Sequence, residues 1–214
     1  DLIDYNFLKE EKKIPEDYHV FWGIEDLKLY SFAKEELLRL SSEEQPFNFT
    51  MLTVDMHTPE GYVCEECPQL YEQPYDNVLS CSDRQLTSFV EWIQSQPFSE
   101  NTTIVITGDH LTMAPIIRDR TPESYDRRVF NLFINPYIDD SANKSDVYNN
   151  REFTTMDLFP TTLASLGVEL YTEKLALGVN LFSGVPTLIE EYDLDMVTSG
   201  INEYSSFYNT LLIE

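Results

Sequence analysis

Residues 102–107, with the sequence TTIVIT, limit what the chain can fold into more than any other segment. The run is short, rich in β-branched residues and apolar through its middle, which is typical of a central strand covered on both faces. It ends directly in Gly108, Asp109 and His110. We therefore expect a strand in the interior of a sheet, with polar residues at its carboxyl end.

Segments that favour strands alternate along the chain with segments that favour helices. Two further strands are predicted over short runs of apolar residues, at residues 47–54 and 128–134. Three helices are predicted from apolar spacing and from Pro and Gly near their ends, over residues 25–40, 82–96 and 157–166. This alternation is typical of an α/β domain with a mostly parallel sheet, in which ligands bind beyond the carboxyl ends of the strands.

Ser82 is predicted to begin the second of these helices. Its hydroxyl can cap the helix N-terminus, and Gln85 stands three residues later, where it would complete a capping box. One apolar face follows at helical spacing, formed by Leu86, Phe89, Val90 and Ile93. Pro97 is expected to end the helix.

The length of 214 residues suits one domain covering residues 1–214. Residues 1–24 are expected to form an irregular lead-in, whereas the packing of residues 185–214 does not follow from their acidic and aromatic composition. No run of about 18 apolar residues occurs, so no membrane span is predicted.

The charge of the chain excludes one class of partner. Fourteen Lys and Arg residues stand against 38 Asp and Glu residues, which gives a formal net charge of −24. Such a surface repels a nucleic-acid backbone, so we expect no nucleic-acid partner. An anionic substrate would need a divalent cation to offset this charge locally.

Asp109, His110 and His57 are the candidate site residues. A carboxylate beside an imidazole can ligate zinc or manganese if the backbone turns sharply, which Gly108 would permit. His57, in a loop after a predicted strand, could bind an anionic substrate or transfer a proton. The alternatives are that Asp109 caps a helix, that His110 is a surface residue, and that His57 only satisfies a neighbouring carbonyl.

The three cysteines, Cys64, Cys67 and Cys81, lie within one short segment. One interpretation is a disulfide from Cys81 to one of the other two, which requires an oxidising compartment. The other is a zinc site made of the three cysteines and His57. The disulfide is favoured because there is no fourth cysteine and because His57 precedes the pair.

Several motifs, in the same order and at similar spacing, resemble phosphoglycerol transferases that decorate membrane-derived oligosaccharides. Residues 52–61, LTVDMHTPEG, resemble their segment Thr-Val-Asp-x-His-x-Pro-Asp-Gly. Cys67 lies six residues past the glycine, as in that family, and Ser80-Cys81 matches a Ser-Cys pair before a helix. Residues 109–113, DHLTM, match an Asp-His-Leu-x-Met segment after a strand.

Lipoteichoic acid synthases are similar more distantly. They share an Asp-x-x-Pro-Thr helix like residues 157–161 and a Gly-x-x-Leu-Phe-Ser segment like residues 178–183. The whole resemblance runs from about residue 21 to residue 184 and places the chain in the alkaline phosphatase and sulfatase superfamily. It implies a three-layer α/β sandwich, of which this chain would be the C-terminal part.

The resemblance also implies roles for single residues. Asp109 and His110 would be metal ligands, usually to manganese, with zinc or magnesium as options. His57 would contact the phosphoglycerol group of the substrate and act in catalysis. Cys67 and Cys81 would form a disulfide, which leaves Cys64 as an extra cysteine.

The family's threonine nucleophile, a further acidic metal ligand and a phosphate-binding arginine have no counterpart here. We expect them, and a membrane anchor, before Asp1, so these residues alone should be inactive and could self-associate. The implied activity moves phosphoglycerol from a lipid-linked donor to a glycan or polymer acceptor on the extracytoplasmic face of the cytoplasmic membrane. A sulfatase or phosphodiesterase of the same superfamily, or a non-catalytic surface binding domain, are the alternatives.

Overall fold

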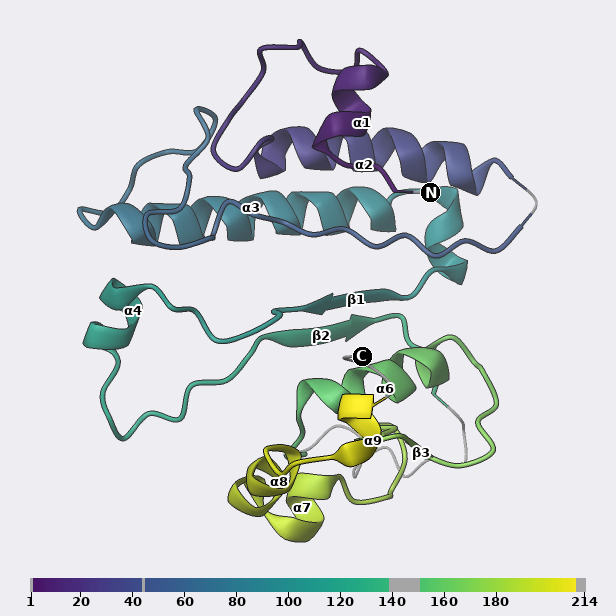
Figure 1. Cartoon of the computed structure of the whole chain (residues 1–214). Helices are drawn as coiled ribbons and strands as arrows, with labels where there is room; N and C mark the ends of the chain where they lie inside the picture. Colours follow the sequence, from purple (N-terminus) through teal and green to yellow (C-terminus); the bar gives the residue numbers. More distant parts are fainter. Residues whose placement is uncertain (1, 44, 139–150, 211–214) are drawn as a thin grey trace. The chain divides into compact units, whose positions relative to one another are not determined.

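The computed structural model describes residues 2–43, 45–138 and 151–210, and the chain divides into two compact units (Figure 1). The first unit consists of Asp1–Asn101 and His110–Arg128, and the second of Thr102–Asp109 and Val129–Glu214. No helix in the described ranges is long and apolar enough to cross a membrane. The prediction that residues 1–214 form one domain stays a prediction.

The first unit is built around helices. These are α1 (Tyr5–Glu10), α2 (Asp26–Ser41), α3 (Pro74–Gln94), the 3-10 helix η1 (Pro97–Asn101) and α4 (Pro115–Arg120). The long helices α2 and α3 pack against each other, with the rings of Tyr30 and Phe89 4.9 Å apart between centroids. The buried residues of α2, which are Asp26, Tyr30, Ala33 and Leu37, recur every three or four positions. This spacing gives the helix a single buried face.

The lead-in over residues 1–24 contains α1 and contributes to the core of the first unit. Leu8 and Ile14 are only 2% and 3% exposed, so this segment is packed although most of it is irregular. The Asp4 side chain caps α1 by accepting a hydrogen bond from the backbone N–H of Phe7 at 2.8 Å. A single helical turn is stabilised in this way at its N-terminus.

The predicted start of α3 is wrong, whereas the predicted helix over residues 25–40 is confirmed by α2. Helix α3 begins at Pro74, and Ser82 is buried in its interior. Pro is favoured at the first helical position because its φ angle is already suitable for a helix. Tyr75, Val78 and Cys81 then extend the buried face upstream of Ser82, so the helix does not need to begin there.

The second unit contains two small antiparallel ladders. Strand β1 (Ile104–Thr107) pairs with β2 (Asn131–Ile134), with Ile104 opposite Ile134 and Thr107 opposite Asn131. The second ladder joins β3 (Lys174–Leu175) to β4 (Gly178–Val179). The predicted strands at residues 102–107 and 128–134 therefore exist in shorter form.

The prediction of a mostly parallel sheet is not borne out in the described residues, where both ladders are antiparallel. Residues 104–106 are half-buried and not fully covered, and residues 47–54 form no strand there. An apolar run indicates burial, but the direction of a strand depends on its partner. The partner of β1 returns after residues 108–130, which reverse the direction of the chain.

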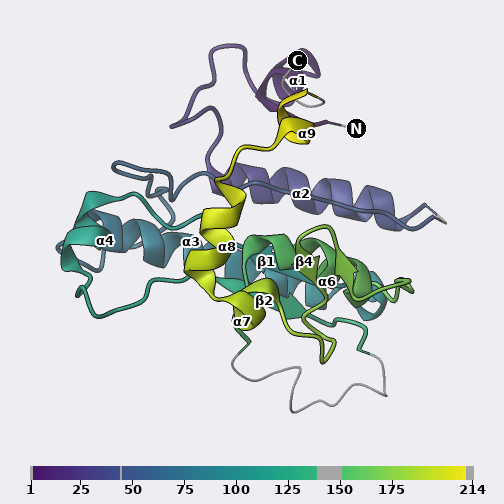
Figure 2. The same cartoon turned by 60° about the horizontal axis from the view of Figure 1, so that its bottom comes forward.

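The other described elements of the second unit are helical. They are η2 (Thr155–Asp157), α6 (Leu158–Ser165), α7 (Leu188–Tyr192), α8 (Leu194–Ile201) and α9 (Ser206–Tyr208). The predicted helix at residues 157–166 is confirmed by α6, with Pro160 in its first turn and Gly167, at φ +75°, after its end. Helices α7 and α8 follow one another and are in contact (Figure 2).

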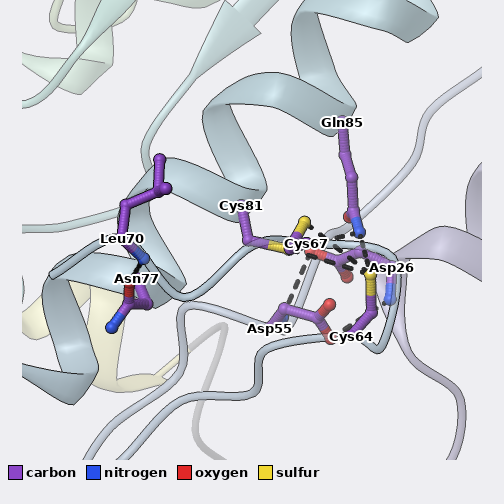
Figure 3. The surroundings of a disulfide bond; sticks show 8 residues. All are labelled: Asp26, Asp55, Cys64, Cys67, Leu70, Asn77, Cys81 and Gln85. Carbon is purple, nitrogen blue, oxygen red and sulfur yellow. Dashed lines mark hydrogen bonds between the residues drawn. A yellow bond between two sulfur atoms is a disulfide. The ribbon is translucent and has the colours of Figure 1, made fainter.

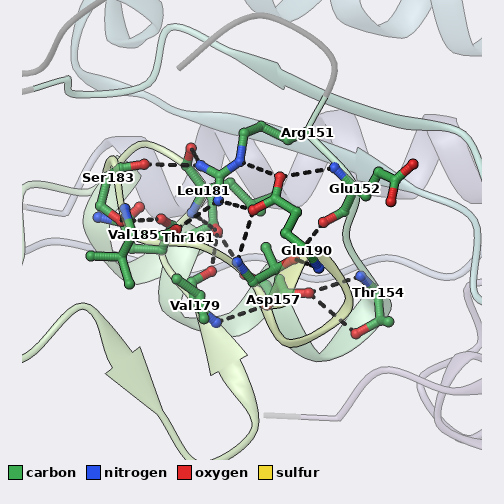
Figure 4. A network of polar contacts seen from close by, with 12 residues as sticks. Arg151, Glu152, Thr154, Asp157, Thr161, Val179, Leu181, Ser183, Val185 and Glu190 are labelled. Atoms are coloured by element: carbon green, nitrogen blue, oxygen red, sulfur yellow. Dashed lines mark hydrogen bonds and ion pairs between the residues drawn. The ribbon is translucent and has the colours of Figure 1, made fainter. Parts of the chain in front are cut away.

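Arg151 and Glu190 fix the beginning of the C-terminal tail, which the sequence left unplaced (Figure 4). The Arg151 guanidinium forms two hydrogen bonds with the Glu190 carboxylate, at 2.8 and 2.9 Å. It also donates to the backbone carbonyls of Leu181, Ser183 and Val185 at 2.7 to 3.0 Å. One guanidinium thus holds several loop carbonyls and one carboxylate together.

Candidate functional site

His57 lies in a tight loop of the first unit. The backbone N–H of His57 donates to the Val54 carbonyl at 2.8 Å, and that of Gly61 donates to the His57 carbonyl at 3.1 Å. Gly61 has φ +67°, and a Cβ atom there would lie 2.7 Å from the Val78 side chain. The position therefore requires glycine both for its backbone angle and for its close approach to α3.

Two contacts orient the imidazole ring of His57. Its Nδ1 lies 2.7 Å from the carbonyl oxygen of Thr58, which can only accept a hydrogen bond, so Nδ1 carries the proton. The ring of Trp22 lies 4.0 Å away between centroids. The half-buried imidazole therefore has Nε2 as the nitrogen able to bind a substrate oxygen or exchange a proton.

A pair of buried carboxylates holds the start of this loop (Figure 3). Asp26 and Asp55 are each 1% exposed. Oδ1 of Asp55 accepts from the backbone N–H of Asp26 at 3.1 Å. The Asp26 carboxylate in turn accepts from the N–H groups of Val54, at 2.7 Å, and Asp55, at 3.2 Å.

The two carboxylates differ from ordinary aspartates in their acidity. Burial, followed by the nearby charge of Asp26, raises the pKa of Asp55 to about 7. Burial also raises the pKa of Asp26, although the hydrogen bonds from Val54 and Asp55 act in the opposite direction. This pair could not be inferred from the sequence, in which its signal is limited to the position of Asp55 two residues before His57.

Asp109 and His110 follow β1 directly, as predicted, and both are exposed. The backbone N–H of Gly108 donates to the carbonyl of Phe130 at 3.0 Å, so the ladder continues up to Asp109. Gly108 does not have the left-handed backbone angle expected for a sharp turn. It lies close to the Val129 side chain instead, since a Cβ atom there would be 3.0 Å from it.

The donors offered by Asp109 and His110 fit a divalent metal. Nδ1 of His110 lies 2.9 Å from the carbonyl oxygen of Leu111 and so carries the proton, which makes Nε2 the ring nitrogen suited to ligate a metal. A carboxylate oxygen and an imidazole nitrogen suit manganese or zinc. Asp109 belongs to the second unit, and His57 and His110 belong to the first. Convergence of the three side chains stays a prediction.

A disulfide joins Cys67 to Cys81, with 5.5 Å between their Cα atoms, which is the pairing implied by the family resemblance. Cys64 is buried and has a free thiol. Within the described residues, the group of side chains close enough to hold a metal consists of the three cysteines and does not include His57. The alternative zinc site with His57 as a ligand is therefore not supported.

Comparison with known families decides the family of the chain. A sequence model described as Sulfatase matches residues 1–168, which is more than half of the chain. The chain belongs to the sulfatase family. Membership of the sulfatase family implies an α/β fold of the alkaline phosphatase type. It agrees with the alkaline phosphatase and sulfatase superfamily that the sequence motifs indicated for this chain.

Proteins named phosphoglycerol transferase I are among the curated relatives that are similar to this chain. The protein from Xanthomonas campestris pv. campestris (strain B100) is 34% identical over 122 residues, which cover 54% of this chain and 17% of that protein. The protein from Escherichia fergusonii is 31% identical over 105 residues, covering 45% of this chain and 13% of that protein. The chain thus matches less than a fifth of the length of these relatives. No solved structure matches the chain.

Proposed function

We propose that this sulfatase family chain contributes residues to the active site of a metal-dependent phosphoglycerol transferase. The observation that carries the proposal is the 34% identity to phosphoglycerol transferase I of Xanthomonas campestris pv. campestris. The fixed orientation of His57 supports it, because its ring is held through Nδ1 and has Nε2 for a substrate. The activity is proposed for the full-length protein.

His57 is proposed to bind the phosphoglycerol group through Nε2 and to donate a proton to a leaving oxygen when the ring is charged. The Thr58 carbonyl holds the ring during this step by accepting the Nδ1 proton. Asp109 and His110 are proposed to hold the metal. A divalent ion, manganese first and zinc or magnesium as options, would when bound offset phosphate charge and lower the pKa of a hydroxyl nucleophile.

The proposed substrates are a phosphatidylglycerol-type donor and a glycan or polymer acceptor at the extracytoplasmic face of the membrane. The Cys67–Cys81 disulfide supports an oxidising compartment. The net charge of −24 supports a cation at the site, since the substrate is itself anionic.

The test of His57 is a pair of histidine variants in the full-length protein, with transfer of phosphoglycerol to a soluble glycan as the readout. His57→Ala is expected to lower kcat/KM by about 100-fold or more, the usual contribution of a positioned acid–base group. His19→Ala is the control, because His19 is exposed and contacts the Tyr5 hydroxyl at 3.4 Å. Equal activity of both variants would remove His57 from the mechanism.

The test of the metal ligands measures manganese binding as well as activity. Asp109→Asn and His110→Ala are each expected to weaken Mn²⁺ binding by about 10-fold or more. The affinity is measured by calorimetry and by the spin-resonance signal of free Mn²⁺. Asp126→Asn is the control, because Asp126 is exposed and pairs only with exposed Arg128 in the described residues. Unchanged affinity in both ligand variants would contradict the metal assignment.

Hydrolysis of sulfate esters is the second candidate, because the family model that matches the chain is described as Sulfatase. Cys67 does not fit the sulfatase signature Cys-x-Pro-x-Arg, because Pro68 comes one place too early and no suitable Arg follows. It is also bonded to Cys81 and cannot be the nucleophile in this form. An aryl sulfate and a phosphodiester assayed with the same preparation separate the two activities. If the protein turns over neither of these substrates and also does not transfer phosphoglycerol from the lipid donor to the glycan acceptor, a non-catalytic binding domain is favoured.

A further inference from the structure

The free thiol of Cys64 lies beside both sulfurs of the disulfide (Figure 3). Its Sγ is 3.8 Å from Sγ of Cys67 and 3.8 Å from Sγ of Cys81. Cys64 and Cys81 are each 3% exposed. Three sulfur atoms, all within 4.8 Å of one another, thus form a cluster at the buried side of α3. The proposed phosphoglycerol transfer makes no use of this cluster.

Gln85 points its amide into the sulfur cluster. Its Nε2 lies 3.1 Å from Sγ of Cys64 and 3.6 Å from Sγ of Cys81, one turn earlier on α3. Gln85 is 9% exposed, and its Oε1 is buried without a hydrogen-bond partner among the described residues. A buried amide oxygen without a partner is costly, so the orientation of this amide, with Nε2 toward Cys64 and Cys81, requires an explanation.

The position of Cys64 relative to the other two sulfurs matches two edges of a metal tetrahedron. The third edge, between Cys67 and Cys81, would have to open from the bonded distance when the disulfide is reduced. In a tetrahedral zinc site with Zn–S bonds of about 2.3 Å, two sulfur ligands are separated by about 3.8 Å. Both distances from Cys64 already have this value. Direct attack of the Cys64 thiolate on the disulfide is less well matched, because attack in line would place Cys64 nearer to one sulfur than to the other.

We propose that Cys64, Cys67 and Cys81 bind one Zn²⁺ ion when the disulfide is reduced, with the amide oxygen of Gln85 as the fourth ligand. A dithiol reductant would open the Cys67–Cys81 bond by giving it two electrons and two protons, and would itself become a disulfide. The three thiols would release three protons when zinc binds, since thiolates are the ligands. A half-turn of the Gln85 amide would bring Oε1 to the position of Nε2.

Burial makes this site depend on the ion. Three thiolates inside the protein would be unfavourable without a cation to offset their charge. One Zn²⁺ leaves a net charge of −1 and matches the soft character of the sulfur ligands. The disulfide and the zinc-bound form would be alternative links between the segment at Cys64–Cys67 and helix α3.

The experiment uses the full-length protein, reduced with a dithiol that is then removed without air. Co²⁺ is added as a spectroscopic probe, because thiolate ligands give it a strong near-ultraviolet absorption that Asp109 and His110 would not produce. Zn²⁺ is expected to displace Co²⁺ at one equivalent, and a competing chromophoric chelator gives the affinity. The oxidised protein is expected to show no such absorption.

Two variants and one matched control complete the design. Cys64→Ser keeps the disulfide and is expected to weaken Zn²⁺ binding by the reduced protein by more than about 100-fold, whereas Gln85→Leu is expected to weaken it by about 10-fold. Gln94→Leu, at an exposed position of the same helix, is expected to have no effect. Absence of the cobalt–thiolate absorption in the reduced protein would overturn the proposal. So would a Cys64→Ser variant with unchanged affinity, with circular dichroism confirming that each protein is folded.

Discussion

Asp55→Asn is expected to remove a pH dependence from the stability of the first unit. In the folded protein, burial and the charge of Asp26 raise the pKa of Asp55 from an ordinary 3.8 to about 7. Between these two values the folded protein binds a proton that the unfolded chain has released. The contribution of Asp55 is therefore most favourable below pH 4 and is lost as the pH rises through about 7.

The size of this effect follows from the pKa change. Each unit of difference between the folded and the unfolded protein corresponds to about 1.4 kcal/mol, so a rise from 3.8 to about 7 corresponds to about 4 kcal/mol. Asparagine at position 55 keeps an oxygen to accept the hydrogen bond of the Asp26 N–H but carries no charge. The free energy of unfolding of the variant minus that of the wild type should therefore increase by about 4 kcal/mol as the pH rises from 4 to 8.

The assay is urea unfolding at a series of pH values, followed by tryptophan fluorescence. Both tryptophans of the chain, Trp22 and Trp92, lie in the first unit, so the signal reports that unit. Asp17→Asn, at an exposed position, is the control for a general change in charge. A difference between Asp55→Asn and the wild type that stays constant from pH 4 to pH 8 would refute the reasoning.

Three further predictions concern stability. Arg151→Met is expected to cost about 3 kcal/mol, because it removes the cation that Glu190 and several loop carbonyls share. Lys174→Met, in the exposed pair with Glu191, should cost less than about 1 kcal/mol by the same chemical unfolding measurement. Burial acts to raise the pKa of Glu190, but hydrogen bonds from Arg151 and from backbone N–H groups hold it at about 2. The second unit should therefore lose stability as the pH falls from about 4.5 to 2, by only about 1 to 2 kcal/mol because Glu190 is exposed and solvent screens the interaction. Glu190→Gln should abolish this loss in unfolding followed by circular dichroism. Gly178→Ala would place a Cβ atom 2.0 Å from the Met156 carbonyl oxygen and is expected to cost about 3 kcal/mol or more, whereas Gly184→Ala, with nothing within 4 Å, should change stability by less than about 1 kcal/mol.

Helices could be predicted from the sequence where their signals are local. Helix α2 follows from its apolar spacing, and α6 from Pro160 near its start and Gly167 after its end. The start of α3 was misplaced because Ser82 has the residue type of an N-cap, although burial of the preceding turn decides the boundary. Burial of Tyr75 and Val78 extends the helix upstream of Ser82. A capping motif at Ser82 carries no information about this burial.

Strand direction could not be predicted from the sequence. The run at residues 102–107 indicates a strand, and β1 is present, but its antiparallel partner β2 lies beyond a long excursion. Pairing depends on where a distant segment returns, and hydrophobic pattern does not encode this. In the candidate site, the position of Asp109 after β1 could be predicted, because Asp109 closely follows the strand in the sequence. The buried partner of Asp55 lies 29 residues earlier in the chain and could not be inferred from spacing.

The loop that carries His57 keeps features that cost stability, and they bear on the role proposed for His57. Asp26 and Asp55 place two carboxylates out of water, an arrangement that lowers stability at neutral pH. The same loop is closed by Gly61 against Val78, and the Tyr75 hydroxyl donates to the carbonyl of Met56 at 2.6 Å. A fold that keeps a destabilising pair next to an oriented histidine departs from what stability alone would select. Such departures are expected at sites where geometry serves function, and here they surround His57.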